Sequence, residues 1–469
     1  MSRRSRYLLK NTFSFALGKF GTRLISFFLV PLYTYVLSTE EYGTVDLIST
    51  VGTVVMPILI LNISEAVMRF CLDHGADHKK IMSTGLMILF AATLSGAFLI
   101  PIFYLIPVFS AYSLLIYAYI ISLAYSQVFL CYLRGQEKVT AYSVGSIIHT
   151  ASAAGLNILF LVVFQWGISG YLLAYTVSNV ITAIYAACAG RADRAIREFG
   201  IDRELTVSMI RFSVVLIPNS FMWWIINSSD RVMVTAFIGV AANGIYAAAY
   251  KIPSMLSTVS EVFNQAWLYS AIREKNSADE TEYHNDMYNN MVQVLTVVTA
   301  GVLLFIKPFL WLYVAPEYYS AWIYTPYLLI GFMFLSLATF LSTHYMMHKD
   351  SLGFLMSSIM GALVNIILNL LLIPVIGVVG AALATCVSYI SVFLFRAVHT
   401  KKYIRIKVLR PRHLVCYGLL IAMGALLFVD GIIGIILLAV LFIAVLILSR
   451  DFLVTLLRSV GKKVKNNEK

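Results

Sequence analysis

The feature that most limits the fold of this 469-residue chain is its series of long, nearly uninterrupted apolar runs. Many runs approach the length of about 20 residues that a helix needs to span a bilayer. Lipid offers no hydrogen-bond partners to backbone groups, so only α-helices and closed β-barrels cross a membrane. A barrel would show short, alternating strands of about ten residues. The chain is therefore predicted to be an all-α integral membrane protein.

Composition supports this class. Apolar residues make up 60% of the chain and charged residues only 12%, whereas soluble domains average about a quarter charged residues. About fourteen transmembrane helices are predicted at spanning length. They cover residues 11–36, 43–69, 81–104, 108–133, 141–165, 168–190, 207–237, 243–271, 287–313, 321–346, 352–373, 377–396, 413–429 and 431–449.

Positive charge sorts to alternate sides of these spans. Of the 35 lysines and arginines, all but five lie before the first span, after the last, or in and at the edges of every second gap between spans. Because basic residues are enriched on the cytoplasmic side of membrane proteins, both termini are predicted to be cytoplasmic. The net charge of +12 then indicates anionic lipid headgroups as neighbours and does not require nucleic acid.

Five basic residues lie inside the apolar runs, where an ionised group needs a partner or a water-filled cavity. Lys19 and Arg23 are four residues apart and share one face of the first span. Lys307 lies close enough to the end of its span for its side chain to reach the interface. Arg231 and Lys251 lie at similar depths in sequential spans, which would allow both to approach one anionic group.

Four acidic residues lie in the same runs: Asp46, Glu65, Asp230 and Glu261. One interpretation is that ion pairs between these acids and the basic residues fix the packing of the helices. The other is that the excess of positive charge leaves a cationic cavity for an anionic substrate such as a phosphate or diphosphate. Asp230 and its neighbour in sequence point to different sides of one helix, so they cannot simply neutralise each other.

Sequence motifs of catalysis are absent from the chain. It has no phosphate-binding GxxxxGK[ST] loop, no HExxH, no GxSxG and no CxxC. The predicted external loops are a few residues long and contain few acids, so they offer little to activate an acceptor or hold a metal. We therefore expect that the protein is not an enzyme, has no metal site, and needs no cofactor beyond a coupling ion such as H⁺ or Na⁺.

A weak internal repeat divides the chain. Leu37–Gly43, reading L-S-T-E-E-Y-G, is echoed by Ile238–Gly244, reading I-G-V-A-A-N-G. Each segment is expected to form the tight external turn between the first two helices of a six-helix block, although chance similarity between apolar segments would also explain the echo. The predicted domains are an N-terminal lobe at 1–200, a C-terminal lobe at 201–405, and two further helices with a basic tail at 406–469.

Prolines inside the predicted spans include Pro57, Pro218, Pro253 and Pro326. Proline removes a backbone donor and bends a helix. Bends in the helices that contain the charges suit a site that opens to alternate sides of the membrane. They are equally consistent with fixed bends that do not move.

A series of short motifs follows one order along most of the chain. The first half contains Val30–Thr34, Leu37–Ser38, Glu41–Gly43, Asp46–Leu47, Arg69–Phe70 and Leu133–Lys138. The second half contains Asp230–Arg231, Gly244–Tyr246, Tyr250–Lys251, Glu317–Tyr318, Val364–Leu370 and Gly380–Ala382. In this order the chain resembles the bacterial O-antigen and capsule flippases, the polysaccharide branch of the multidrug/oligosaccharidyl-lipid/polysaccharide exporter superfamily.

The resemblance implies two six-helix lobes in a V around a central cavity, with two extra C-terminal helices. It implies a multi-pass protein of the bacterial inner membrane that flips undecaprenyl-diphosphate-linked oligosaccharide from the cytoplasmic to the external leaflet. Alternating access would be driven by an ion gradient or the membrane potential. The candidates for binding the diphosphate and glycan are Lys19, Arg23, Arg231 and Lys251. The candidates for ion coupling are Asp46, Glu65 and Glu261.

The partners implied by the resemblance are the lipid-linked glycan, membrane lipids, and a polysaccharide polymerase with other assembly proteins. Within the same superfamily, a lipid II flippase and a drug/cation antiporter are alternatives. An antiporter would favour an acidic or aromatic cavity over a basic one. Alternatives of another class are a lipid scramblase and a non-transporting scaffold of a glycan-assembly complex.

Overall fold

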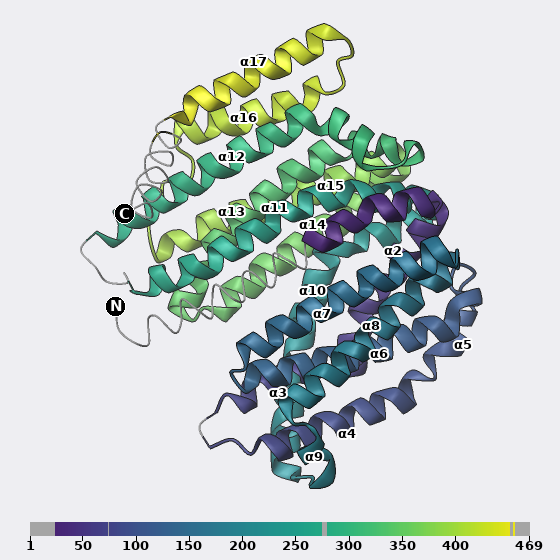
Figure 1. Cartoon of the computed structure of the whole chain (residues 1–469). Helices are drawn as coiled ribbons and strands as arrows, with labels where there is room; N and C mark the ends of the chain where they lie inside the picture. Colours follow the sequence, from purple (N-terminus) through teal and green to yellow (C-terminus); the bar gives the residue numbers. More distant parts are fainter. Residues whose placement is uncertain (1–23, 74, 274–278, 451–453, 455–469) are drawn as a thin grey trace, which may run out of the picture. The chain divides into compact units, whose positions relative to one another are not determined.

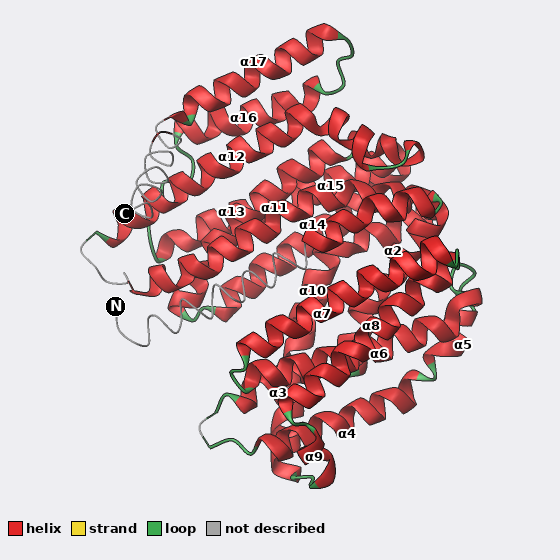
Figure 2. Ribbon diagram, viewed as in Figure 1, coloured by secondary structure: helices red, strands yellow, loops and turns green. Residues whose placement is uncertain are grey.

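The computed structural model describes residues 24–73, 75–273, 279–450 and 454, and the regular structure in these ranges is helical (Figures 1 and 2). Nine of the described helices are long and apolar enough to cross a membrane. Shorter apolar helices lie at Leu24–Val36, Pro411–Leu426 and Ile432–Leu448. The predicted all-α membrane fold class is therefore confirmed. Lys19 and Arg23 lie outside the described residues.

The chain divides into two compact units, Met1–Ala248 and Ala249–Lys469. After Leu24–Val36, the first unit contains α2 (Thr39–Leu59), α3 (Ile63–Cys71), α4 (His78–Gly96), α5 (Leu99–Tyr104), η1 (Ser110–Tyr112), α6 (Ser113–Gly135), α7 (Val139–Asn157), η2 (Ile158–Val163), α8 (Gly167–Gly190), α9 (Asp193–Arg197), α10 (Arg203–Phe237) and the start of α11 (Val240–Arg273). The second unit contains the rest of α11, α12 (Glu280–Tyr313), η3 (Pro316–Ile323), α13 (Thr325–His348), α14 (Ser351–Ile376), α15 (Val378–His399), η4 (Thr400–Lys402), α16 (Pro411–Leu426) and α17 (Ile432–Leu448). The predicted division at 200 and 405 stays a prediction.

The second predicted span is not one helix. Pro57 lies near the end of α2, and the backbone then turns through Leu61 and Asn62, whose φ angles are 51° and 52°. Left-handed residues other than glycine are uncommon and end a right-handed helix. The break places Glu65 in the first turn of a separate helix, α3, where an acid is favourable beside the helix N-terminus.

The other prolines behave differently from one another. Pro218 and Pro253 lie inside the long helices α10 and α11. Pro326 begins α13, where the missing backbone donor costs nothing because the first turn has no acceptor for it. The prediction that Pro326 interrupts a span is therefore wrong.

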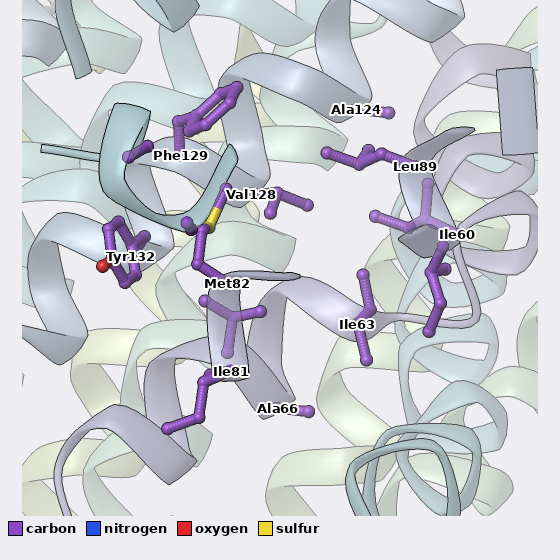
Figure 3. Packing of buried hydrophobic residues seen from close by; sticks show 14 of the residues in the cluster. Ile60, Ile63, Ala66, Ile81, Met82, Leu89, Ala124, Val128, Phe129 and Tyr132 are labelled. Carbon is purple, nitrogen blue, oxygen red and sulfur yellow. The ribbon is translucent and has the colours of Figure 1, made fainter. Parts of the chain in front are cut away.

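The core of the first unit surrounds the break. Ile60 and Ile63 on either side of it are fully buried and pack in one apolar cluster with Met82 of α4 and Val128 of α6 (Figure 3). Burial of such side chains contributes roughly 1.5–3 kcal/mol each. The break is thus held in place by the packing of α3 against α4 and α6.

Arg396 is a basic residue of the second unit whose burial could not be seen from its position in the sequence. It ends the predicted span 377–396, and the structure places it inside α15, where it is only 1% exposed. Its Nε donates to Ser357 Oγ at 3.0 Å, and its Nη1 donates to the carbonyl of Ala338 at 2.9 Å. Arg396 therefore ties α15 to α14 and α13.

Candidate functional site

The two echoed turns meet in the first unit. A Cβ added to Gly43 would lie 2.0 Å from the carbonyl oxygen of Val240, and a Cβ added to Gly244 would lie 2.0 Å from that of Thr39. Residues 43 and 244 are 201 positions apart, as are residues 39 and 240. The contact is therefore reciprocal, and each helix needs glycine because the other helix's backbone occupies the space of a side chain.

Local sequence fixes how α2 enters this crossing. Ser38 caps the helix: its hydroxyl accepts a hydrogen bond from the Glu41 backbone at 3.2 Å, and the Glu41 carboxylate accepts one from the Ser38 backbone at 2.9 Å. This capping box satisfies two backbone donors at the helix N-terminus. It holds the first turn of α2 against the start of α11.

An ion pair lies one turn beyond the crossing. Arg231 of α10 donates from Nη1 to Oδ1 of Asp46 on α2 at 3.0 Å. The two side chains are 14% and 6% exposed. Asn243 adds a third element: its Nδ2 donates to the carbonyl of Gly43 at 3.1 Å and lies 3.5 Å from Oδ2 of Asp46. Asp46, a candidate for ion coupling, and Arg231, a candidate for binding the diphosphate, thus pair with each other.

Asp230, the neighbour of Arg231, faces a different helix. Its carboxylate accepts a hydrogen bond of 2.5 Å from the hydroxyl of Tyr246 on α11, and its residue is fully buried. This confirms that the adjacent acid and base point to different sides of α10. Further along α10, Trp224 donates from its indole to the carbonyl of Thr50 at 2.9 Å. Together these bonds join α2, α10 and the start of α11.

The remaining predicted site residues lie elsewhere. Glu65 is partly buried on α3 of the first unit. Lys251 is partly buried and Glu261 is exposed, both on the part of α11 that belongs to the second unit. Lys307 lies with its Nζ 4.0 Å from the ring centre of Trp322 and 3.4 Å from Oδ1 of Asp430. Binding and coupling roles for these residues stay predictions.

Sequence reasoning did not assign a role to three residues of this network. Asn243 lies inside the echoed segment I-G-V-A-A-N-G, so the repeat was the signal that could have found it. Tyr246 follows the same segment by two residues. Trp224 gave no signal, because one indole in an apolar run is ordinary for a membrane helix.

Comparison with known proteins defines the class. The family described as polysaccharide biosynthesis protein matches residues 8–269, more than half of the chain. The protein therefore belongs to this family, and the resemblance noted from its motifs is confirmed. A search of curated protein sequences gives no match.

Solved structures share the fold. The lipid II flippase MurJ in an inward closed conformation matches with a TM-score of 0.67 at 14% identity, covering 94% of this chain and 99% of that one. An inward-facing multidrug resistance MATE transporter of the MOP superfamily matches with 0.61 at 14% identity, covering 82% and 94%. A MOP superfamily transporter from Pyrococcus furiosus with a binding pocket of reversed polarity matches with 0.51 at 13% identity, covering 84% and 95%. The fold is that of the flippases and transporters of this superfamily.

Proposed function

We propose that this protein flips undecaprenyl-diphosphate-linked oligosaccharide repeat units, such as those of O-antigen or capsule, across the bacterial inner membrane. The observation that carries the proposal is the match to polysaccharide biosynthesis proteins over residues 8–269. A chain of membrane helices without sequence motifs of catalysis contributes to polysaccharide synthesis most directly by moving an intermediate. Both termini face the cytoplasm in this proposal, and the glycan leaves on the external side.

The charges inside the membrane suit a diphosphate. Arg231 and Lys251 are the proposed ligands, with Lys19 and Arg23 in support. Guanidinium groups bind phosphate oxygens in bidentate fashion, so an arriving diphosphate competes with Asp46 for Arg231. The substrate then opens the ion pair that joins α2 to α10.

The driving force follows from the charge that moves. The membrane potential contributes about 2.3 kcal/mol per elementary charge for each 100 mV. Asp46, Glu65 and Glu261 are the proposed coupling acids for H⁺ or Na⁺. Proposed partners are membrane lipids and the polymerase and assembly proteins that receive the external glycan.

Two alternatives are tied to the structural matches. The match to a lipid II flippase favours that substrate, and the matches to multidrug transporters favour a drug or cation antiporter. Proteoliposomes offered a fluorescent undecaprenyl-diphosphate oligosaccharide, lipid II or a cationic dye separate the three. We expect transport of the oligosaccharide alone, detected by an impermeant glycosidase.

The site is tested by charge removal in the same vesicles. Arg231→Ala combined with Lys251→Ala should abolish flipping. Because Arg231→Ala also leaves Asp46 without its partner, Asp46→Asn/Arg231→Gln is measured beside it to separate loss of the ligand from loss of stability. Lys307→Ala is the matched control. It removes a lysine from another predicted span, which contacts Asp430 and Trp322 and has no proposed role in binding the diphosphate. Flipping that survives the Arg231→Ala/Lys251→Ala change would show that these cations do not bind the diphosphate.

A further inference from the structure

A second buried polar cluster lies in the second unit, apart from every residue discussed above. His284 of α12 and His344 of α13 are both fully buried, with ring centroids 5.0 Å apart and planes inclined by 34°. None of their four ring nitrogens has a hydrogen-bond partner among the described residues. The indole Nε1 of Trp267 and the side-chain amide of Asn264, both on α11, are also without partners there.

Such a concentration of unmet groups is unusual. More than about nine in ten buried polar groups in proteins are hydrogen-bonded, and each exception costs roughly 1–3 kcal/mol. His413 of α16 shows the ordinary arrangement at the same depth of burial. Its Nδ1 pairs with the carbonyl of Val408 at 3.0 Å and its Nε2 with Oδ1 of Asn289 at 3.1 Å. The four ring nitrogens of His284 and His344 can therefore still form hydrogen bonds that the described residues do not supply.

Aromatic contacts hold the pair in position. Trp267 lies edge-on to His284 at 4.9 Å and stacks on Phe340 of α13 at 4.9 Å. Tyr283 packs beside His284 and hydrogen-bonds Ser270 at 2.7 Å. The rings are thus gathered from three helices and wedged together, which is how a protein pre-positions a binding group.

The neighbourhood selects the ligand. Groups of three or more His, Cys, Asp or Glu side chains that would hold a metal are absent from the described residues. The titratable groups beside the pair are Glu280 and Tyr283 on α12 and His348 on α13. From α11 the pair meets Trp267, which does not titrate. A proton suits two adjacent neutral imidazoles, because one ring nitrogen accepts it and then donates to the other ring.

We propose that His284 and His344 form a binding site for one shared proton. A lone pair on one imidazole nitrogen takes a proton from a hydronium ion, which leaves as water, and a small reorientation of the rings forms an N–H···N bond of about 3 Å between them. His284 lies four residues after the start of α12, and His344 four residues before the end of α13, at ends that the positive charges predict to be cytoplasmic. This step rests on the proposed function: with the proton bound at this site, H⁺ is the ion whose movement drives export.

The test reads the histidines directly. Full-length protein with ¹⁵N-labelled histidine in lipid nanodiscs is titrated by NMR between about pH 8 and pH 5. We expect the resonances of His284 and His344 to titrate together, with about one proton taken up by the pair. His284→Gln should shift the midpoint of His344, and His344→Gln that of His284. His413→Gln, the control for a buried histidine with both nitrogens bonded, should shift neither.

Two results would overturn the site: neither resonance titrates while the protein stays folded, or the two titrate independently. The wild-type titration alone decides this if a variant fails to fold. In proteoliposomes, the export rate of the His284→Gln/His344→Gln protein should change less with pH than the rate of the wild type. Absence of any flipping by the wild type would refute the proposed function, while the NMR titration, which needs no substrate, still decides the proton site.

Discussion

The two buried polar regions of this protein differ in how their hydrogen-bonding groups are used. In the first unit, Asp46 and Arg231 pair at 3.0 Å, and Asp230 accepts from Tyr246. In the second unit, His284 and His344 are equally buried, but no ring nitrogen has a partner in the described part of the chain. A network built from mutual partners stabilises one arrangement of helices. A cluster with unmet groups lowers stability, and its retention indicates a ligand or a second state.

The largest expected effect is at the glycine crossing that supports the paired network. Gly244→Ala places a Cβ 2.0 Å from the Thr39 carbonyl, and two helix backbones must separate to admit it. We expect a loss of more than about 3 kcal/mol of stability, or failure to fold. Fluorescence-detected size exclusion measures the folded fraction.

Gly155→Ala in α7 is the matched control, since a Cβ there meets nothing within 4 Å. It should leave the protein unchanged or stabilise it by up to about 1 kcal/mol. Normal folding of Gly244→Ala would mean that the close approach of α2 and α11 is not required.

The next effect is at the ion pair. Arg231→Ala leaves Asp46 charged and mostly buried, which should cost about 3–5 kcal/mol. The charge-neutral double change Asp46→Asn/Arg231→Gln should recover most of this loss, because neither group is then an isolated charge. Thermal unfolding in detergent tests both variants.

Export separates the structural role of this pair from a binding role. A double variant that is stable but inactive supports Arg231 as a phosphate ligand. A double variant that is stable and fully active would reduce the pair to a packing device.

The histidine cluster should respond in the opposite direction. His344→Phe removes two unmet nitrogens and keeps an aromatic ring beside His284. We expect stability to be unchanged or to rise by about 1–2 kcal/mol, by the same thermal assay. A large loss of stability would show that His344 makes contacts that the fold needs. It would also mean that the polar groups of the second unit stabilise the protein as those of the first unit do.

A smaller effect is expected at Lys307. Its partner Asp430 is 93% exposed, and exposed ion pairs contribute about 0–1 kcal/mol. Lys307→Ala should therefore lower stability by less than about 1–2 kcal/mol even with its contact to Trp322 included. A loss of stability as large as that caused by Arg231→Ala would contradict the expectation that buried ion pairs contribute more to stability than exposed ones.

The smallest effect concerns a cluster between α13 and α14. Hydrogen bonds from the Tyr403 hydroxyl, the Gly353 backbone and the Lys402 ammonium hold the pKa of the Asp350 carboxyl well below its usual range. A lowered pKa stabilises the folded state above the unfolded value of about 3.9, and this stabilisation is lost as the pH falls. Asp350→Asn should lower the melting temperature slightly at pH 7. The difference should shrink below about pH 4, and a constant difference would contradict a charge effect.

The sequence predicted the helical membrane class, because hydrophobic length is a local signal. Of the fourteen spans expected, nine helices of spanning length and three shorter apolar helices are found among the described residues. The sequence missed the break at Leu61 and Asn62, because left-handed backbone at non-glycine residues has little local signature. It singled out Asp46 and Arg231 but left open whether they pair. That choice depends on residues 185 positions apart meeting in space.

The histidine pair could not be predicted in the same way. His284 lies in a charged stretch before the predicted span 287–313, His344 lies near the end of the span 321–346, and the two are 60 positions apart, so no local pattern connects them. Only the arrangement of the helices shows that the two rings lie side by side and that their nitrogens have no partner among the described residues. Whether a histidine is buried, and whether its nitrogens have partners, depends on how the helices pack and cannot be read from the amino-acid composition.

The reciprocal glycine crossing has a consequence for how the contact can be changed by substitution. A contact in which position i of one copy meets j of the other, and j meets i, is the isologous contact of a two-fold homodimer. Here both copies of that contact lie in one polypeptide, as Gly43 with Val240 and Gly244 with Thr39. The two turns therefore meet with the local symmetry of a dimer contact that is contained within one chain. In a homodimer one substitution would change both glycines at once, whereas here Gly43 and Gly244 can be replaced one at a time, so each half of the contact can be tested by itself.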